Sequence, residues 1–479
     1  MLTSIRHGII AGLTALLLVG IGLKAADLGN AIYSETDASN SASTLFPEGM
    51  APSAVNDNLR GFTGAIYRWY NHTQASTTST GSSNAYVLTY AVTPAAYVTG
   101  DLYTFRANFL NTASPTLNVN GLGARSIVGP ATSSMSLQVS QVRDGMHLSV
   151  GYDAATGTFR VQSPLAENKP VTPQGRLTLT TGVAVQVSAT VSSATVYFTP
   201  YGGNTYPVYD GQSWINRVLT AELSQALDSS GNSGAHTAAG NFDFFLIDDA
   251  NTARLCTGPA WTSDTARGTG AATTQLSIRD GIQVNLVSMA CRFGTAAGNT
   301  VTVAPFRATY VGTMRTTAAG LTEYSFGGIS AGGTDAKLFL WNMYNRAFVS
   351  ATMRDNTDSW TYTGGWRSAN ASDFMRARFV RGFDEDTISA WYHCLGNSGA
   401  GNANCSVALD TSANITTNGI SGMLGATTSS GRGGFVRIPG LGYHFAQAIE
   451  DGSGATVGTF YGDSGGGILQ SGMTFETRM

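Results

Sequence analysis

The chain has little charge. Charged residues make up 12% of its 479 residues, against roughly 25% in typical soluble domains. Lys and Glu are scarce, so the strong helix formers that usually carry charged helix faces are largely missing. The 27 Lys and Arg residues are balanced by 30 Asp and Glu residues, giving a formal net charge of −3. No basic stripe is present to neutralise phosphates, which excludes a typical nucleic-acid-binding protein.

Cysteine is also rare. The four cysteines are Cys256, Cys291, Cys394 and Cys405, and their spacing fits no zinc-binding pattern. Three disulfide pairings are possible. Cys394 and Cys405 flank "LGNSGAGNAN", which we expect to be a hairpin loop that a disulfide could close. Four free, buried thiols are the equally open alternative.

Glycine, by contrast, is abundant, at 58 of 479 residues. Ser, Thr, Asn and Ala fill much of the remainder, and short β-branched and aromatic runs alternate with Gly and Asn turns. This pattern predicts a mainly β fold, with a short N-terminal α-helical trimerisation stem followed by serial β-sandwich-like modules. A surface of hydroxyls, amides and glycine is typical of extracellular or virion-surface proteins.

The N-terminal stretch "MLTSIRHGIIAGLTALLLVGIGLKAADLG" is ambiguous. Its uncharged run from Gly8 to Leu23 is shorter than the ~20 residues of a membrane span. It has the form of a secretory signal, with Ala25 or Ala26 near a plausible cleavage point. A retained helix, in a membrane or docked among other subunits, is the alternative, and we favour docking.

A helix is expected to follow, starting at Pro52 with Ser53 as its N-cap. Its apolar positions recur with spacings of 4, 3, 4 and 3, a heptad a/d seam over two heptads. Such a short helix is marginal alone and needs a partner, which a parallel bundle of identical chains would supply. The alternative is a lone amphipathic helix packed against its own β domain. The seam positions are Val55, Leu59, Phe62, Ile66 and Trp69.

The chain divides into four predicted regions. Residues 1–75 form the docking segment and stem, and 84–165 a first β module of short alternating strands. The Pro-containing stretch "LAENKPVTPQG" marks a boundary before a second module, 176–348, and a C-terminal module, 349–479. No repeat of 20–50 residues is evident, which disfavours a solenoid or propeller.

Several stretches resemble bacteriophage tail-fibre proteins. "YSETDASNSASTLFPEGMAPSAVNDNLRGFTGAIYRWYN" is similar to a recurring N-terminal fibre segment, and "NAYVLTYAVTPAAYVTGDLYTFRANF" to the β module that often follows it. "YFTPYGGN", "VYDGQSW", "YVGTMRTT" and "WNMYNR" resemble pieces of another phage module. Within the N-terminal segment, Phe46 stands where a Trp-like residue is usual, and the matching residues are Glu48, Gly49, Pro52, Ser53, Val55 and Asn56.

The resemblance implies a homotrimeric, non-enzymatic virion protein that attaches a phage to its host. Other phage structural proteins would hold its N-terminus, and its C-terminal module would meet a host cell-surface glycan or protein. Three alternatives stay open: a head-attached capsid fibre or decoration protein, a glycan-depolymerase tailspike, and a secreted adhesin at a bacterial surface. No cofactor is expected, and host and receptor are not predicted.

One stretch, "YGDSGGGIL", suggests an enzyme. Gly-Asp-Ser-Gly-Gly surrounds the nucleophilic serine of chymotrypsin-like proteases. The contexts of His236 and His393 do not match that family, and only 15 residues follow Ser464, too few to build a specificity pocket. Asp, Ser and Gly are also the residues that shape tight turns. We therefore predict a turn at Ser464 and no catalytic residues.

The acidic residues carry no clear catalytic or metal-binding motif. Asp384, Glu385 and Asp386 could form a weak Ca²⁺ site, but a solvated acidic turn is favoured and no metal is predicted. A depolymerase would need two carboxylates across a sugar cleft. Asp358, Asp384 and Glu450 are the available candidates, and no motif marks them.

Aromatic residues gather in the C-terminal module. Exposed rings stack on sugar faces, and neighbouring amides and hydroxyls bond sugar hydroxyls, so we expect some of them to contact a host glycan. The alternative is that alternate aromatics fill the sandwich core. The predicted receptor contacts are Trp360, Tyr362, Trp366, Tyr443 and His444; Trp391 and Tyr392 lie in the same module.

Overall fold

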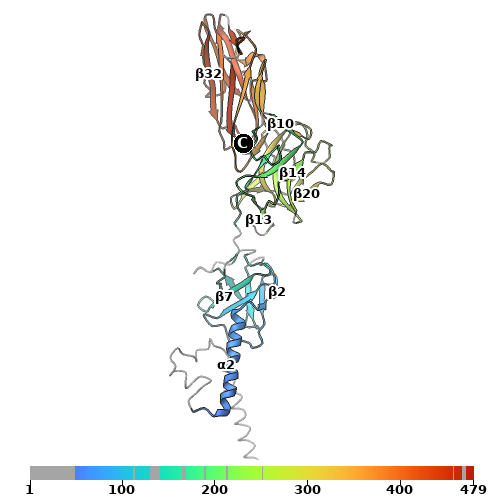
Figure 1. Ribbon diagram of the computed structural model, residues 1–479, viewed down its shortest axis with the longest axis vertical. Helices are drawn as coiled ribbons and strands as arrows, with labels where there is room; N and C mark the ends of the chain where they lie inside the picture. Colours follow the sequence, from blue (N-terminus) through green and yellow to red (C-terminus); the bar gives the residue numbers. More distant parts are fainter. Residues whose placement is uncertain are drawn as a thin grey trace, which may run out of the picture. The chain divides into compact units, whose positions relative to one another are not determined.

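The computed structural model describes residues 49–479 except for 112–113, 130–136, 138–140, 164, 166–168, 188–189, 212–213, 233, 251, 457 and 467–470. The apolar N-terminal stretch, with its predicted signal, membrane or docking role, lies outside these residues, as do Phe46 and Glu48. The chain divides after residue 168 into two compact units. It is mainly β with one α-helix in the described part, which confirms the predicted fold class at this level (Figure 1).

The helix, α2 (Pro52–Thr73), begins two residues earlier than a Ser53 N-cap allows. Ala51 occupies the cap position with an extended backbone and gives no side-chain cap, so the Ser53 prediction is wrong. Pro52 instead stands at the first helical position, where its fixed φ and missing N–H carry no cost. At the other end, Gln74 donates its amide to Tyr70 O at 3.0 Å.

Eight strands follow α2 in the first unit and make one sheet in the order β1-β4-β7-β8-β6-β5-β3-β2. Because β1 and β2 are consecutive in the chain, the sheet nearly closes on itself. Between them, Ser79 donates its amide to Arg106 O at 2.9 Å. The strands are β1 (Thr77–Thr78), β2 (Thr80–Ser82), β3 (Ala85–Leu88), β4 (Leu102–Arg106), β5 (Thr116–Val119), β6 (Arg125–Val128), β7 (His147–Asp153) and β8 (Thr158–Val161).

This first module is a nearly closed barrel, which corrects the expected sandwich. Parallel pairings of β1 with β4, β3 with β5 and β6 with β8 carry one sheet around the core instead of stacking two sheets. Alternate residues point inward, as on β4, where Tyr103 and Phe105 are buried between exposed or half-buried neighbours. The interior is aromatic and aliphatic, and includes Tyr86, Leu117 and Phe159.

The second unit contains the remaining strands. They are β9 (Gly175–Thr178), β10 (Thr190–Ser193), β11 (Thr195–Pro200), β12 (Thr205–Tyr209), β13 (Trp214–Val218), β14 (Leu223–Ala226), β15 (Asn241–Asp249), β16 (Thr252–Thr257), β17 (Leu276–Arg279), β18 (Ile282–Asn285), β19 (Met289–Arg292), β20 (Thr300–Val303), β21 (Thr309–Ala318), β22 (Leu321–Ser330), β23 (Thr334–Leu338), β24 (Leu340–Asn342), β25 (Phe348–Asp355), β26 (Trp360–Thr361), β27 (Arg367–Ser368), β28 (Arg376–Arg381), β29 (Ile388–Asn397), β30 (Gly401–Leu409), β31 (Gly422–Leu424), β32 (Ser429–Arg437), β33 (Gly442–Ala455), β34 (Thr459–Tyr461) and β35 (Gly472–Arg478), with a short 3₁₀ helix at Ala369–Ala371.

Sheets continue across the middle of this unit. β22 pairs in parallel with β25, and β23 with β28, so hydrogen bonds join strands on both sides of residue 348. One hydrophobic core extends from Leu177 to Met479. The boundary expected at 348/349 thus falls inside a single compact unit.

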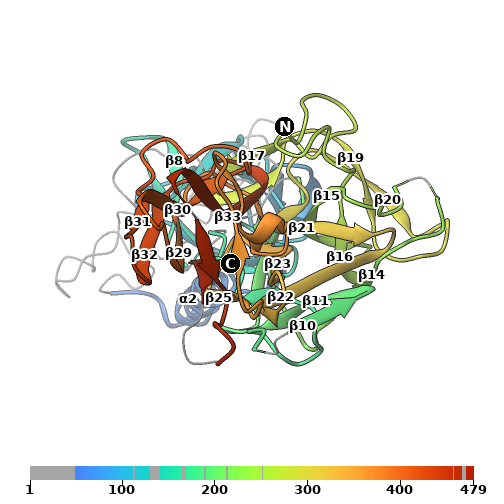
Figure 2. The same ribbon diagram turned by 90° about the horizontal axis from the view of Figure 1, so that it is seen from above.

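The C-terminal strands form two packed sheets. One contains β25, β35, β29 and β32 side by side, and the other contains β28, β33, β30 and β31 (Figure 2). Strand β25 alternates strictly, with Val349, Ala351, Met353 and Asp355 buried and the intervening residues exposed. Each face of such a strand therefore has one role, inward packing or outward contact.

Two disulfides stabilise the second unit. Cys394–Cys405 joins β29 to β30, which lie in different sheets, and so ties together the two C-terminal sheets. Cys256–Cys291 joins the neighbouring strands β16 and β19. The expected Cys394–Cys405 disulfide is confirmed, and the alternative of four free thiols is wrong. The loop between these cysteines connects two sheets, so the expected hairpin is not what forms.

Candidate functional site

The heptad positions of α2 face solvent. Val55 is 45% exposed, Leu59 54%, Ile66 43% and Trp69 55%, while Phe62 is half-buried. The helix packs on its own barrel through a different side, where Ala65 is buried and His72 lies 4.1 Å from Tyr90, ring centre to ring centre. At about 100° per residue, Ala65 is roughly 80° around the helix from the seam. The seam is therefore not the surface by which α2 packs on its own β domain.

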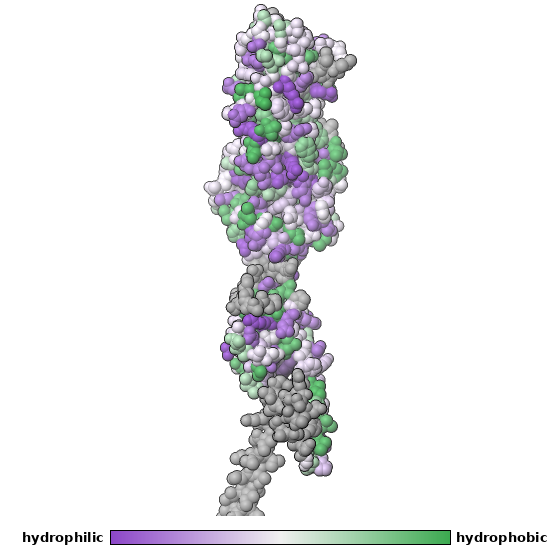
Figure 3. Space-filling model, turned by 90° about the vertical axis from the view of Figure 1, so that its left-hand side faces the viewer, coloured by the Kyte–Doolittle hydropathy of each residue, from purple (hydrophilic) through white to green (hydrophobic). Residues whose placement is uncertain are grey.

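Further aromatic side chains widen this exposed surface. Tyr67 and Tyr70 stack on each other at 6.3 Å and are both exposed. Figure 3 shows hydrophobic atoms, in green, on the uncovered part of α2. No helix among the described residues is long and apolar enough to cross a membrane. An uncovered stripe of large apolar side chains on a helix is typical of a protein–protein contact.

Two of the predicted receptor aromatics belong to an internal cluster around Glu450. Trp360 donates its Nε1–H to Glu450 Oε2 at 2.9 Å and stacks on Phe460. The Arg367 guanidinium binds Glu450 Oε1 at 2.8 Å and covers the Tyr362 ring at 3.6 Å. Burial raises the pKa of Glu450, against the opposing effect of its bonds to Trp360 and Arg367. These contacts hold Trp360 and Tyr362 in structural positions.

Tyr443 and His444 are also engaged internally. The Arg315 guanidinium lies 3.7 Å from the centre of the Tyr443 ring. His444 is buried, with Nδ1 2.7 Å from Asp410 Oδ2. Trp366 is half-buried. The five residues therefore do not form one exposed aromatic surface in this unit.

Three of the acidic candidates, Glu385, Asp386 and Glu450, are ion-paired. Arg346 binds both Glu385, at 2.6 Å, and Asp386. Arg381 also lies 3.6 Å from Asp386, so two of the three carboxylates considered for Ca²⁺ are ion-paired. Among the described residues, no group of His, Cys, Asp and Glu side chains is arranged to hold a metal ion. Glu450, considered for sugar hydrolysis, is held by Arg367 beneath the surface.

Ser464 lies in a tight turn. Its φ is +52°, and the Asp463 carboxylate accepts the Gly465 amide at 3.0 Å, the pattern of an Asx turn. Gly462 lies against Thr357, where its amide donates to Thr357 O at 2.9 Å. In the part of the chain that the structure describes, no histidine hydrogen bonds to Ser464.

His236 belongs to a buried polar network instead. Its Nδ1 accepts the Asp228 amide at 2.9 Å, and its Nε2 lies 2.8 Å from Thr257 Oγ1. Because Nδ1 is an acceptor, the ring is neutral. Burial, assisted by the nearby Arg292 charge, lowers the pKa of His236 to about 4. Arg292 pairs with the buried Asp228, whose pKa is lowered to about 2 because hydrogen bonds and this charge outweigh desolvation.

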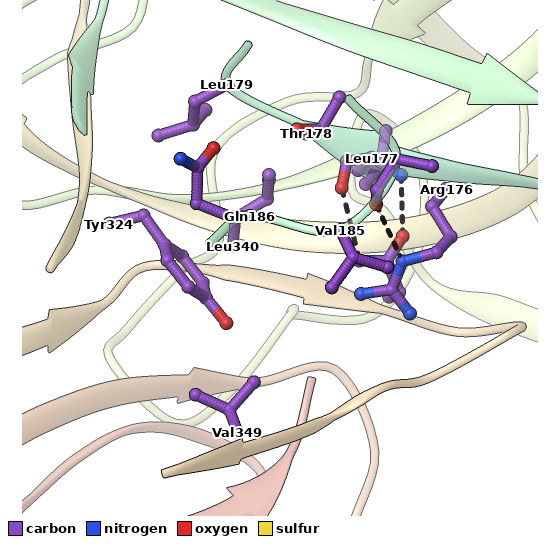
Figure 4. Close-up of a pocket in the computed structure, with 11 residues that line it drawn as sticks. Arg176, Leu177, Thr178, Leu179, Val185, Gln186, Tyr324, Leu340 and Val349 are labelled. Carbon is purple, nitrogen blue, oxygen red and sulfur yellow. Dashed lines mark hydrogen bonds between the residues drawn. The ribbon is translucent and has the colours of Figure 1, made fainter. Parts of the chain in front are cut away.

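Two pockets of the second unit differ in volume. The pocket in Figure 4, lined by Arg176, Gln186, Tyr324 and neighbours, has about 20 Å³ of space, which suits a single water. A more open cleft of about 360 Å³ lies beside β12, β15 and β20 and is bordered by Asp210, Asp248 and Arg307. Asp248 is neutralised there by Arg217.

The comparisons with known proteins add no relative. No family model matches the chain. No curated protein shows significant similarity to it. The resemblance to phage fibres thus rests on the sequence stretches themselves and stays a prediction.

Proposed function

We propose that this chain is a structural virion protein, a bacteriophage tail fibre that self-associates as a homotrimer and mediates attachment to the host cell. The uncovered heptad seam of α2 is the observation that carries the proposal. A folded chain that already packs one side of this helix still leaves Val55, Leu59, Ile66 and Trp69 in water. Identical seams would cover one another in a parallel bundle.

Other features support the same function. Two disulfides suit a protein outside the reducing cytoplasm. The low charge and the hydroxyl-rich strands suit a particle surface. Three copies side by side would also present three receptor sites together, so that their joint avidity exceeds a single-site affinity by ~10² or more.

The test is to find the chain on particles and to count its copies. We expect native mass spectrometry of the full chain to give three times the chain mass of 49.9 kDa. Antibodies against residues 169–479 should label purified virions at the tail and block adsorption to host cells. A monomeric mass at micromolar concentration, or particles without this chain, would refute the proposal. Labelling of the capsid would instead identify a head-attached fibre, and loss of host capsule on incubation a depolymerase.

A further inference from the structure

The outer face of one C-terminal sheet combines an aromatic ring, hydroxyls and positive charge. On β29, Ile388, Ala390, Tyr392 and Cys394 point inward and are fully buried. Ser389, Trp391 and His393 alternate with them and point outward. The strand registers place Trp391 in a row with Thr352 of β25, Thr474 of β35 and Gly434 of β32. We call the outward positions of β25, β35, β29 and β32 the Trp391 face.

The indole of Trp391 lies low on this face. Its Nε1–H donates to Ser389 Oγ at 3.1 Å, two residues back on the same strand, so the ring extends along its strand. The neighbour on one side is Gly434 and on the other the short Thr474. The Arg432 guanidinium lies 4.8 Å from the ring centre. The ring therefore has small neighbours across the strands, and the Arg432 guanidinium lies over one of its faces.

The charge of the Trp391 face differs from that of the whole chain. Its outward positions carry Arg354, Arg432 and Arg478 but a single acid, Glu476. The chain as a whole has a formal charge of −3. In Figure 3, where the side of the molecule bearing β32 faces the viewer, hydrophilic and hydrophobic atoms alternate over the surface. A local excess of arginine complements an anionic ligand.

Hydroxyl groups surround the ring. Ser350, Thr352, Ser389 and Thr474 all occupy outward positions on three adjacent strands. Hydroxyls both donate and accept, as sugar hydroxyls do, and the apolar face of a sugar packs on an indole. A second copy of the chain is a poorer occupant, because a surface with three arginines and one acid repels its own copy.

We propose that the Trp391 face binds an acidic glycan. One sugar ring replaces the Arg432 guanidinium on the Trp391 indole, its carboxylate or phosphate pairs with the displaced guanidinium, and its hydroxyls bond Ser389 and Thr474. The inference names the receptor chemistry for the proposed attachment function and rests on that function for its biological role. It moves receptor contact from Trp360, which is expected from the sequence but bonds the buried Glu450, to Trp391, which is also half-buried but bonds Ser389 on its own outward face.

The first experiment compares polymers on the purified full-length chain. Immobilised chain is exposed to polygalacturonate, which carries carboxylates, to a phosphorylated mannan, and to neutral dextran. We expect at least one acidic polymer to bind roughly tenfold or more tightly than dextran, and its binding to weaken between ~50 and ~300 mM salt. Equal binding of dextran, or failure of both acidic polymers to bind, overturns the proposal. So does binding only to phosphatidylglycerol vesicles, which would indicate a membrane surface.

Variants then test the position of the site. Trp391→Ala and Arg432→Gln should each weaken acidic-polymer binding roughly tenfold, while Trp391→Phe retains most of it. Arg307→Gln, at an exposed arginine elsewhere in the same unit, is the matched control and should bind normally. Unchanged binding by both loss variants overturns the proposal. The copy number and the virion location, measured on the same preparations, show separately whether the proposed fibre function is wrong.

Discussion

Substitution of two seam residues should separate the copies of this protein without unfolding them. Leu59 and Ile66 are 54% and 43% exposed in the single chain. Full burial of such a side chain contributes about 1.5–3 kcal/mol, so covering the remaining exposed half contributes about 1 kcal/mol. Two side chains in each of three copies then contribute about 6 kcal/mol, or roughly 10⁴ in the association constant.

The effect on assembly follows from trimer stoichiometry. The chain concentration at half-assembly varies as the square root of the dissociation constant, so Leu59→Ser with Ile66→Ser should raise that concentration roughly 100-fold. Sedimentation equilibrium over a dilution series measures it. Asn56→Ser is the matched control, because Asn56 is exposed on the same helix but lies about 100° around it from the seam. An unchanged midpoint in the double variant, or an equal shift in the control, would show that the seam does not hold the copies together.

Three further predictions concern the second unit. Burial lowers the pKa of His236 to about 4, so its stabilising effect is complete above the unfolded value near 6.5 and is lost as pH falls toward the folded value. Urea unfolding should show about 3 kcal/mol less stability at low pH, and His236→Gln should flatten that dependence. Cys394→Ser should lower the free energy of unfolding by about 3 kcal/mol and Cys256→Ser by about 4, because the bonded pairs are 11 and 35 residues apart; equal losses under non-reducing denaturation would contradict this. Arg367→Met leaves Glu450 buried without its cation and should cost about 2 kcal/mol or more; because burial already raises the Glu450 pKa, the loss should grow as pH rises from 4 to 8, and a pH-independent loss would disprove the coupling.

Local signals in the sequence predicted the local structure. Alternation of apolar residues indicated the strands, the two cysteines that flank a Gly- and Asn-rich loop indicated the Cys394–Cys405 disulfide, and the 4, 3, 4, 3 spacing placed α2. Closure of the first module into a barrel was not predictable, because it depends on the parallel pairing of β1 with β4, strands separated by two others in the chain. Strand period alone does not determine whether a sheet stacks or closes.

The aromatic residues predicted to contact the receptor show the same limit of local sequence signals for single side chains. Trp360 bonds to Glu450, 90 positions along the chain, and His444 to Asp410, 34 positions away. Nothing near either residue in the sequence marks these partners. An aromatic residue in a β module is exposed or internal according to contacts made by remote strands, so composition alone favours both equally.

For Trp391, however, two facts local to β29 are together sufficient to predict that its side chain faces outward. A strand sends alternate side chains to opposite faces, so adjacent Trp391 and Tyr392 must face opposite ways. Cys394 forms an internal disulfide, and Tyr392, two positions before it, must share its inward face. Tyr392 is indeed fully buried, and Trp391 is half-buried on the other face. The Cys394–Cys405 disulfide, once predicted, therefore selects the outward aromatic of β29, whereas its neighbours Thr474 and Arg432 follow only from the strand registers of the structure.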